Sequence, residues 1–144
     1  MKQPPVSPYI KTLGMIYFAR MLDKVRKNAR GELRDDFLEN MGKGFDLRCA
    51  TFLRVPYEDI AAKALEEDDD EALLRWCFDN GRALDENDLF LWNAAIRNRG
   101  FQDDATELLL RRKKESGFED RDEIQTMLQY MEADEGRTPD STSR

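Results

Sequence analysis

The sequence predicts an all-α fold, a compact orthogonal bundle of about six to eight helices in a single domain. Apolar residues recur at spacings of three and four through successive segments, as in helices that bury one face. Short runs of glycine, proline, asparagine and acidic residues separate these segments, and such residues start and stop helices. At 144 residues, with 40% apolar and 37% charged side chains, the chain suits one soluble domain.

The longest periodic segment predicts a helix over residues 8–30. Ser7 is suited to the N-cap, Pro8 to the first helical position and Gly31 to the stop. The expected core-facing residues are Ile10, Gly14, Phe18, Met21, Leu22, Val25 and Ala29.

A polar stripe follows the second half of this helix and holds Arg20, Asp23, Lys24 and Lys27. Helical spacing allows Arg20 to meet Asp23, and Asp23 to meet Lys27. Arg20 has apolar neighbours on the wheel, so its guanidinium needs a carboxylate or carbonyl partner. Two interpretations stay open. A structural ion pair with Asp23 is favoured because such networks are common, and the alternative is an anion-binding role with Lys24.

Residues 32–44 predict a short helix that includes Phe37, Leu38 and Met41. Two glycines around Lys43 resemble a phosphate-binding loop, but the full GxxxxGK[ST] pattern and a preceding strand are absent. A helix stop at these glycines is therefore the preferred interpretation.

Six further helices are expected along the rest of the chain. Their ranges are 45–55, 57–66, a segment capped within 68–70 that ends at residue 80, 85–98, a segment capped at 103 or 104 that ends in the basic run 111–114, and a segment from 120 or 122 through 131. The basic run lies in the last turns of its helix and is expected to be solvated.

The domain boundaries follow from composition. Residues 1–6 are proline-rich and predict an extended arm, residues 7–136 form the helical domain, and the polar residues 137–144 predict a disordered tail.

The chain contains no histidine and only two cysteines, Cys49 and Cys77. This excludes Ser-His-Asp and Cys-His nucleophiles and every zinc site that needs imidazole. The acidic run 66–71 lacks the alternating oxygens and the glycine of a calcium loop, so we expect it to cap a helix. We therefore expect no metal and no cofactor, and we lean against an enzyme.

No apolar run reaches the ~20 residues that span a bilayer, and residues 1–9 lack the apolar core of a signal peptide. These features predict a cytoplasmic protein without membrane partners.

Charge is unevenly distributed along the chain. Residues 1–34 carry eight basic and two acidic side chains, whereas the whole chain has a net charge of −7. The favoured interpretation is that the basic helix lies against acidic groups of its own domain, and the alternative is a basic face for an anionic partner. The acidic remainder makes nucleic acid an improbable partner.

Several motifs resemble a bacterial family known only as a domain of unknown function. They are Ser7-Pro8, Leu13-Gly14, Ala19-Arg-Met-Leu-Asp-Lys24 with Arg26, Asp46-x-Arg48, Phe52-Leu53, Asn98-Arg-Gly100 and Asp134-Glu-Gly-Arg137. Residues 32–44 depart from the family pattern, in which a tyrosine and an Asn-Cys-Pro-like segment are expected. The resemblance covers nearly the whole chain and implies no activity.

Two functional hypotheses from different classes result. The first is a non-catalytic helical module that binds a protein or a small anionic ligand through the face of Arg20 and Lys24. The second is an enzyme or small-molecule sensor whose helical pocket is lined by carboxylates and a lysine, with Arg20, Asp23, Lys24 and Asp46 as the candidate residues.

Overall fold

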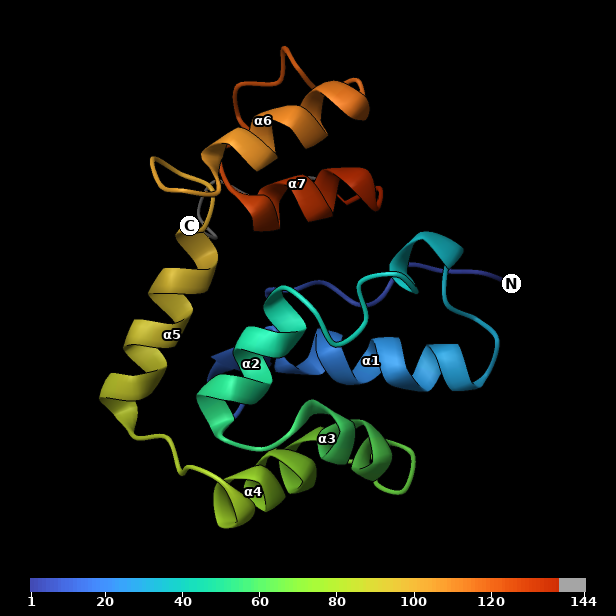
Figure 1. Cartoon of the computed structure of the whole chain (residues 1–144), viewed down its shortest axis with the longest axis vertical. Helices are drawn as coiled ribbons and strands as arrows, with labels where there is room; N and C mark the ends of the chain where they lie inside the picture. Colours follow the sequence, from blue (N-terminus) through green and yellow to red (C-terminus); the bar gives the residue numbers. More distant parts are fainter. Residues whose placement is uncertain (138–144) are drawn as a thin grey trace. The chain divides into compact units, whose positions relative to one another are not determined.

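The computed structural model of the chain describes residues 1–137, and within them it contains seven α-helices and one two-stranded sheet (Figure 1). This confirms the predicted mostly helical class and the expected number of helices. The chain divides into two compact units, Met1–Leu89 and Phe90–Arg144. Two compact units can belong to one domain or to two. The single domain predicted over residues 7–136 therefore stays a prediction.

The first unit is built around helix α1. Its elements are β1 (Lys11–Thr12), β2 (Met15–Ile16), α1 (Phe18–Ala29), the 3₁₀ helix η1 (Asp35–Phe37), α2 (Phe45–Leu53), α3 (Tyr57–Ala64) and α4 (Asp70–Asn80). Helix α3 packs against α1, α2 and α4, and the hairpin lies against α1 and α4. The fully buried side chains that form this core include Met15, Ile16, Phe18, Met21, Leu22, Leu53, Ile60, Leu73 and Leu74.

The helix expected over residues 8–30 is wrong in its first half. β1 and β2 form an antiparallel hairpin in which Thr12 faces Met15. Leu13 and Gly14 join them with φ of 47° and 84°, as the two central residues of a type I′ turn require. Ser7 caps a turn instead of a helix, because its Oγ accepts a hydrogen bond from the Tyr9 amide at 3.2 Å.

Helix α1 begins only after Tyr17, whose φ of 75° is left-handed. The residues from Met15 to Ala19 are all buried, so apolar and polar residues do not alternate with the spacing of a helix in this run. A short, fully buried run fits a strand as well as a helix, which is why the sequence pattern did not separate the two.

Residues 32–44 also differ from the prediction. They contain only the three-residue η1 followed by turns, in place of the expected short helix. Leu38 is 45% exposed and so cannot anchor a helix to the core. Gly42 and Gly44 have φ of 78° and 57°, and Gly44 directly precedes α2.

Two helix starts that depend on local capping were predicted correctly. Helix α4 begins after Asp69, whose carboxylate accepts a hydrogen bond from the Glu71 amide at 3.0 Å, and it ends at Asn80, directly before Gly81. The Asp85 carboxylate accepts from the Asp88 amide at 2.8 Å at the start of the next helix.

The second unit contains α6 (Thr106–Glu115) and α7 (Met127–Asp134), which pack together, and most of α5 (Glu86–Asn98). The cap expected at residue 103 or 104 is wrong, because α6 begins after Ala105, which makes no side-chain capping bond. The predicted start of the last helix at residue 120 or 122 is also wrong. Thr126 is its N-cap and accepts a hydrogen bond from the Gln129 amide at 3.1 Å.

The basic run 111–114 is not wholly solvated, contrary to expectation. Lys113 is 5% exposed, and its ammonium donates to the carbonyl oxygens of Arg121 at 2.8 Å and Ile124 at 2.9 Å. The long apolar stem of lysine allows this burial, while two carbonyls satisfy the charge.

Residues at both ends of the described chain make defined contacts. Within the arm, Gln3 pairs with Leu33 in a parallel bridge. Arg137, placed in the tail by the sequence, is bonded to Glu132 and Glu135. The remainder of the predicted disordered tail, residues 138–144, lies outside the described residues.

Within residues 1–137, every helix is either too short or too polar to cross a bilayer.

Candidate functional site

The structure brings the four predicted site residues into two groups within the first unit. Lys24 and Asp46 come together in a buried cluster. Arg20 and Asp23 instead contact the same residue of the N-terminal arm, Val6.

The buried cluster consists of Tyr17, Lys24 and Asp46. The Tyr17 hydroxyl donates to Asp46 Oδ1 at 2.6 Å, and the Lys24 ammonium lies 2.7 Å from the same oxygen. Lys24 Nζ also donates to the Tyr17 hydroxyl oxygen at 3.1 Å. Because these three residues are only 0–6% exposed, the cluster is closed to solvent.

Three local features position this cluster. Tyr17 precedes α1 with a positive φ, and Lys24 stands two turns further along the same helix. Asp46 lies in the first turn of α2, where a carboxylate is favoured by the helix dipole. Its second oxygen accepts a hydrogen bond from the Gly42 amide at 3.0 Å, which ties the turns before α2 to the cluster.

Burial raises the pKa of a tyrosine hydroxyl in the cluster and of a cysteine thiol beside it. Burial, with the nearby Asp46 carboxylate as a second cause, raises the pKa of Tyr17 well above its ordinary value. The same two causes raise the pKa of the Cys49 thiol. Both groups therefore stay protonated, and Cys49 is not an activated nucleophile.

Tyr57 lies close to the cluster and carries a buried hydroxyl without a hydrogen-bond partner. Burial and the Asp46 carboxylate raise its pKa to about 12. A buried hydroxyl that makes no hydrogen bond is uncommon in folded proteins and calls for an explanation.

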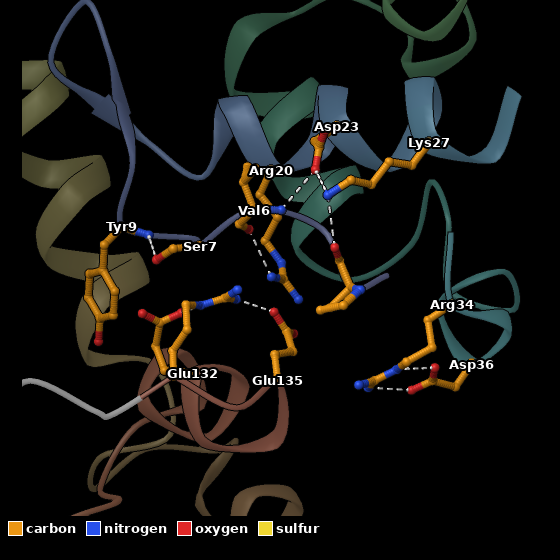
Figure 2. A network of polar contacts seen from close by, with 12 residues as sticks. Val6, Ser7, Tyr9, Arg20, Asp23, Lys27, Arg34, Asp36, Glu132 and Glu135 are labelled. Carbon is orange, nitrogen blue, oxygen red and sulfur yellow. Dashed lines mark hydrogen bonds and ion pairs between the residues drawn. The ribbon is translucent and has the colours of Figure 1, made fainter. Parts of the chain in front are cut away.

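The second group is a clamp on the N-terminal arm, formed by Arg20, Asp23 and Lys27 on one side of α1 (Figure 2). Asp23 Oδ2 accepts from the Val6 amide at 2.9 Å, and Arg20 Nη1 donates to the Val6 carbonyl oxygen at 3.1 Å. Lys27 Nζ donates to the Pro4 carbonyl oxygen at 3.0 Å. We call these three side chains the arm clamp.

The arm also pairs with the chain beyond α1. The Gln3 amide donates to the Glu32 carbonyl oxygen, and the Arg34 amide donates to the Gln3 carbonyl oxygen, each at 2.7 Å. Together with the arm clamp, these contacts satisfy five backbone groups of residues 3–6.

Aromatic and charged side chains border the arm clamp. The Arg20 guanidinium lies 5.5 Å from the ring centre of Phe37, and the Arg34 guanidinium lies 4.9 Å from it. Arg34 binds Asp36 through two hydrogen bonds, of 2.6 and 2.8 Å (Figure 2). These bonds lower the pKa of the Asp36 carboxyl.

The ion pairs support the favoured interpretation of the basic N-terminal region. Six of its eight basic side chains meet acids of the same unit, in the pairs Lys2–Asp35, Lys24–Asp46, Arg26–Asp70, Lys27–Asp23, Arg30–Glu32 and Arg34–Asp36.

Sequence reasoning predicted the Asp23–Lys27 contact, which is confirmed at 2.8 Å. It named Lys24 and Asp46 but not their pairing, and it missed Tyr17, Tyr57 and Val6. The proline-rich arm was the available signal for Val6. The tyrosines gave none, because each reads as an ordinary apolar position on its helix.

The described residues 1–137 contain no group of three or more histidine, cysteine or acidic side chains arranged to hold a metal ion.

The profile of one family, a domain of unknown function (DUF5069), matches residues 2–137 of the chain. No curated protein and no solved structure matches it.

Proposed function

Since the chain belongs to the DUF5069 family, whose description assigns no activity, we propose a function from the geometry of the site. The protein is a non-catalytic module that binds an extended segment of a partner protein through the arm clamp of helix α1. This keeps Arg20 as the recognition residue expected from the sequence and replaces Lys24 by Asp23 and Lys27.

The observation that carries the proposal is the double contact on Val6. The Asp23 carboxylate accepts a hydrogen bond from the Val6 amide, and the Arg20 guanidinium donates one to the Val6 carbonyl oxygen. Two side chains thus make the hydrogen bonds that a neighbouring strand makes in a sheet. Such contacts recognise backbone rather than a particular side chain, and peptide-binding proteins obtain affinity in this way.

Lys24 does not belong to the recognition surface in this proposal. Its side chain is 7% exposed, and its charge is balanced by Asp46. A ligand reaching Lys24 would have to separate a buried ion pair, and that costs several kcal/mol, on the order of 3–5. A partner protein on the Arg20 side is therefore preferred to a small anion bound by Arg20 and Lys24.

The test uses the full chain with its own arm weakened. Val6→Pro removes the amide hydrogen that Val6 donates to Asp23. Val6→Ala keeps both backbone groups and is the matched control. Trypsin cleavage after Lys2 measures arm release, which should be faster in Val6→Pro. A fluorescent peptide with the sequence of residues 2–7 should then bind Val6→Pro and raise its polarisation.

Arg20→Met in the Val6→Pro background should weaken this binding, because a hydrogen bond to a charged donor contributes about 1.5–3 kcal/mol. Absence of peptide binding to a folded Val6→Pro protein whose arm is cleaved rapidly would overturn the proposal.

A second candidate function, a small-molecule sensor or enzyme built on Lys24 and Asp46, is favoured by one observation. The buried Tyr57 hydroxyl near Asp46 has no partner, and a ligand oxygen would supply one. A rise in melting temperature with added acetate that disappears in Tyr57→Phe would support this candidate. An equal response of both proteins would exclude acetate binding at Tyr57.

A further inference from the structure

We infer that the partner segment contains two adjacent prolines in an extended x-Pro-Pro-x sequence, and that residues 3–6 occupy its place within the free protein. This inference rests on the proposed function and names the chemistry of the partner at the same site. It follows from which backbone groups of the arm are bound and which are not.

Within residues 3–6, backbone amide hydrogens form hydrogen bonds at only two positions. The Gln3 amide is bound by the Glu32 carbonyl and the Val6 amide by Asp23. The two positions between them are Pro4 and Pro5, which have no amide hydrogen to leave unsatisfied. Carbonyl oxygens are bound at Gln3, Pro4 and Val6. A Pro-Pro pair therefore loses no hydrogen bond at this site.

Burial adds a preference at one of these positions. Pro5 is buried, Pro4 and Val6 are half-buried, and Gln3 is exposed. The second proline of the segment is thus the residue whose side chain the site encloses. Proline also restricts the free segment to extended conformations, so less conformational entropy is lost on binding.

The charges of the arm clamp match the polar groups of a peptide backbone. Asp23 lies between Arg20 and Lys27 in the sequence and is paired with Lys27 at 2.8 Å. The two cations face carbonyl oxygens, and the carboxylate faces an amide (Figure 2). The site is complementary to the alternating dipoles of a peptide backbone.

Occupation by the arm makes the free protein self-inhibited. A short tether gives the arm an effective concentration on the order of millimolar at its own site. A partner in trans must compete with it, so partner binding and arm release are coupled. Release of residues 2–6 is then a signal that accompanies partner binding.

The experiment compares two peptides on the full-length protein and on Val6→Pro. One peptide has the sequence of residues 2–7, and the other replaces both prolines by alanine. We expect the proline peptide to bind Val6→Pro roughly five- to thirtyfold more tightly than the alanine peptide, from the entropy that two prolines save. We expect the unaltered protein and Val6→Ala to bind the proline peptide at least about tenfold more weakly than Val6→Pro.

Each outcome has a distinct meaning. Equal affinity for the two peptides, or tighter binding of the alanine peptide, overturns the Pro-Pro specificity and leaves the peptide-binding function standing. Equal affinity of the unaltered protein and Val6→Pro overturns self-inhibition by the arm. If Val6→Pro is folded with its arm released and binds neither peptide, the proposed function itself fails.

Discussion

The Lys24 ammonium and the Asp46 carboxylate lie 2.7 Å apart, with side chains that are 7% and 0% exposed. They come from different helices, so their contact fixes α2 against α1. Removing two charges from water is costly, and the pair recovers this cost only through close geometry and additional hydrogen bonds. Tyr17 and the Gly42 amide supply those bonds.

The first prediction follows from this pairing. Lys24→Met or Asp46→Leu alone should lower the free energy of unfolding by about 3–5 kcal/mol, because each leaves a buried charge uncompensated. The double variant should recover a substantial part of that loss. Urea unfolding of the four proteins in a double-mutant cycle measures the coupling, and additive losses would contradict it.

A second prediction concerns alkaline pH. The folded chain holds the pKa of Tyr17 well above its ordinary value of 10.0, so above about pH 10 the unfolded chain binds fewer protons than the folded one. The free energy of unfolding should therefore fall as pH rises past 10, by up to ~1.4 kcal/mol per pH unit for each such group. Below pH 10 this contribution is fully present.

Urea unfolding at pH 8 and pH 11 measures that fall. It should be smaller in Tyr17→Phe, which lacks the titrating group. An unchanged pH dependence in this variant would contradict the assignment to Tyr17.

A third prediction tests the Tyr57 hydroxyl. Tyr57→Phe removes a buried polar atom that has no hydrogen-bond partner and keeps the ring. The variant should be more stable by about 1 kcal/mol, since a buried unsatisfied group costs about 1–3 kcal/mol. Thermal unfolding at pH 7 gives the comparison. A loss of stability would mean that a bound water or ligand partners the hydroxyl in solution.

The fourth prediction rests on the close approach at the end of α4. A Cβ at Gly81 would lie 2.2 Å from the Leu53 carbonyl oxygen and 2.8 Å from that of Arg54, and backbone atoms cannot move aside as a flexible side chain can. Gly81→Ala should cost about 3 kcal/mol or more.

Gly31 is the matched control, because it has a φ of 71° and nothing within 4 Å of an added Cβ. Gly31→Ala should cost only the left-handed backbone penalty of about 1–2 kcal/mol. The reverse order of melting temperatures would contradict the close approach.

The sequence predicted those parts of the fold that depend on neighbouring residues. The Asp69 cap and the Asp23–Lys27 pair are local, with partners two and four residues apart. The interacting groups lie within about one helical turn of each other, so periodicity and capping preferences are enough to predict these contacts.

The parts that were missed depend on residues distant in the sequence. Tyr17 and Lys24 meet Asp46 across separations of 29 and 22 residues, and only the packed unit decides which carboxylate a buried lysine reaches. Arg20 was correctly singled out as needing a carboxylate or carbonyl partner. The sequence could not show that the Val6 carbonyl oxygen is a partner of Arg20. The arm has no periodic pattern of apolar residues, so its position against helix α1 cannot be predicted.

The left-handed residues Leu13 and Tyr17 bear on how the unit folds. Neither has a side chain that favours positive φ, so packing against the rest of the unit must hold them there. We therefore expect the hairpin to be stable only while it packs against α1 and α4. A peptide cut from residues 8–30 has no such packing and is free to extend the helix backward through residues that are strand and turn in the intact protein.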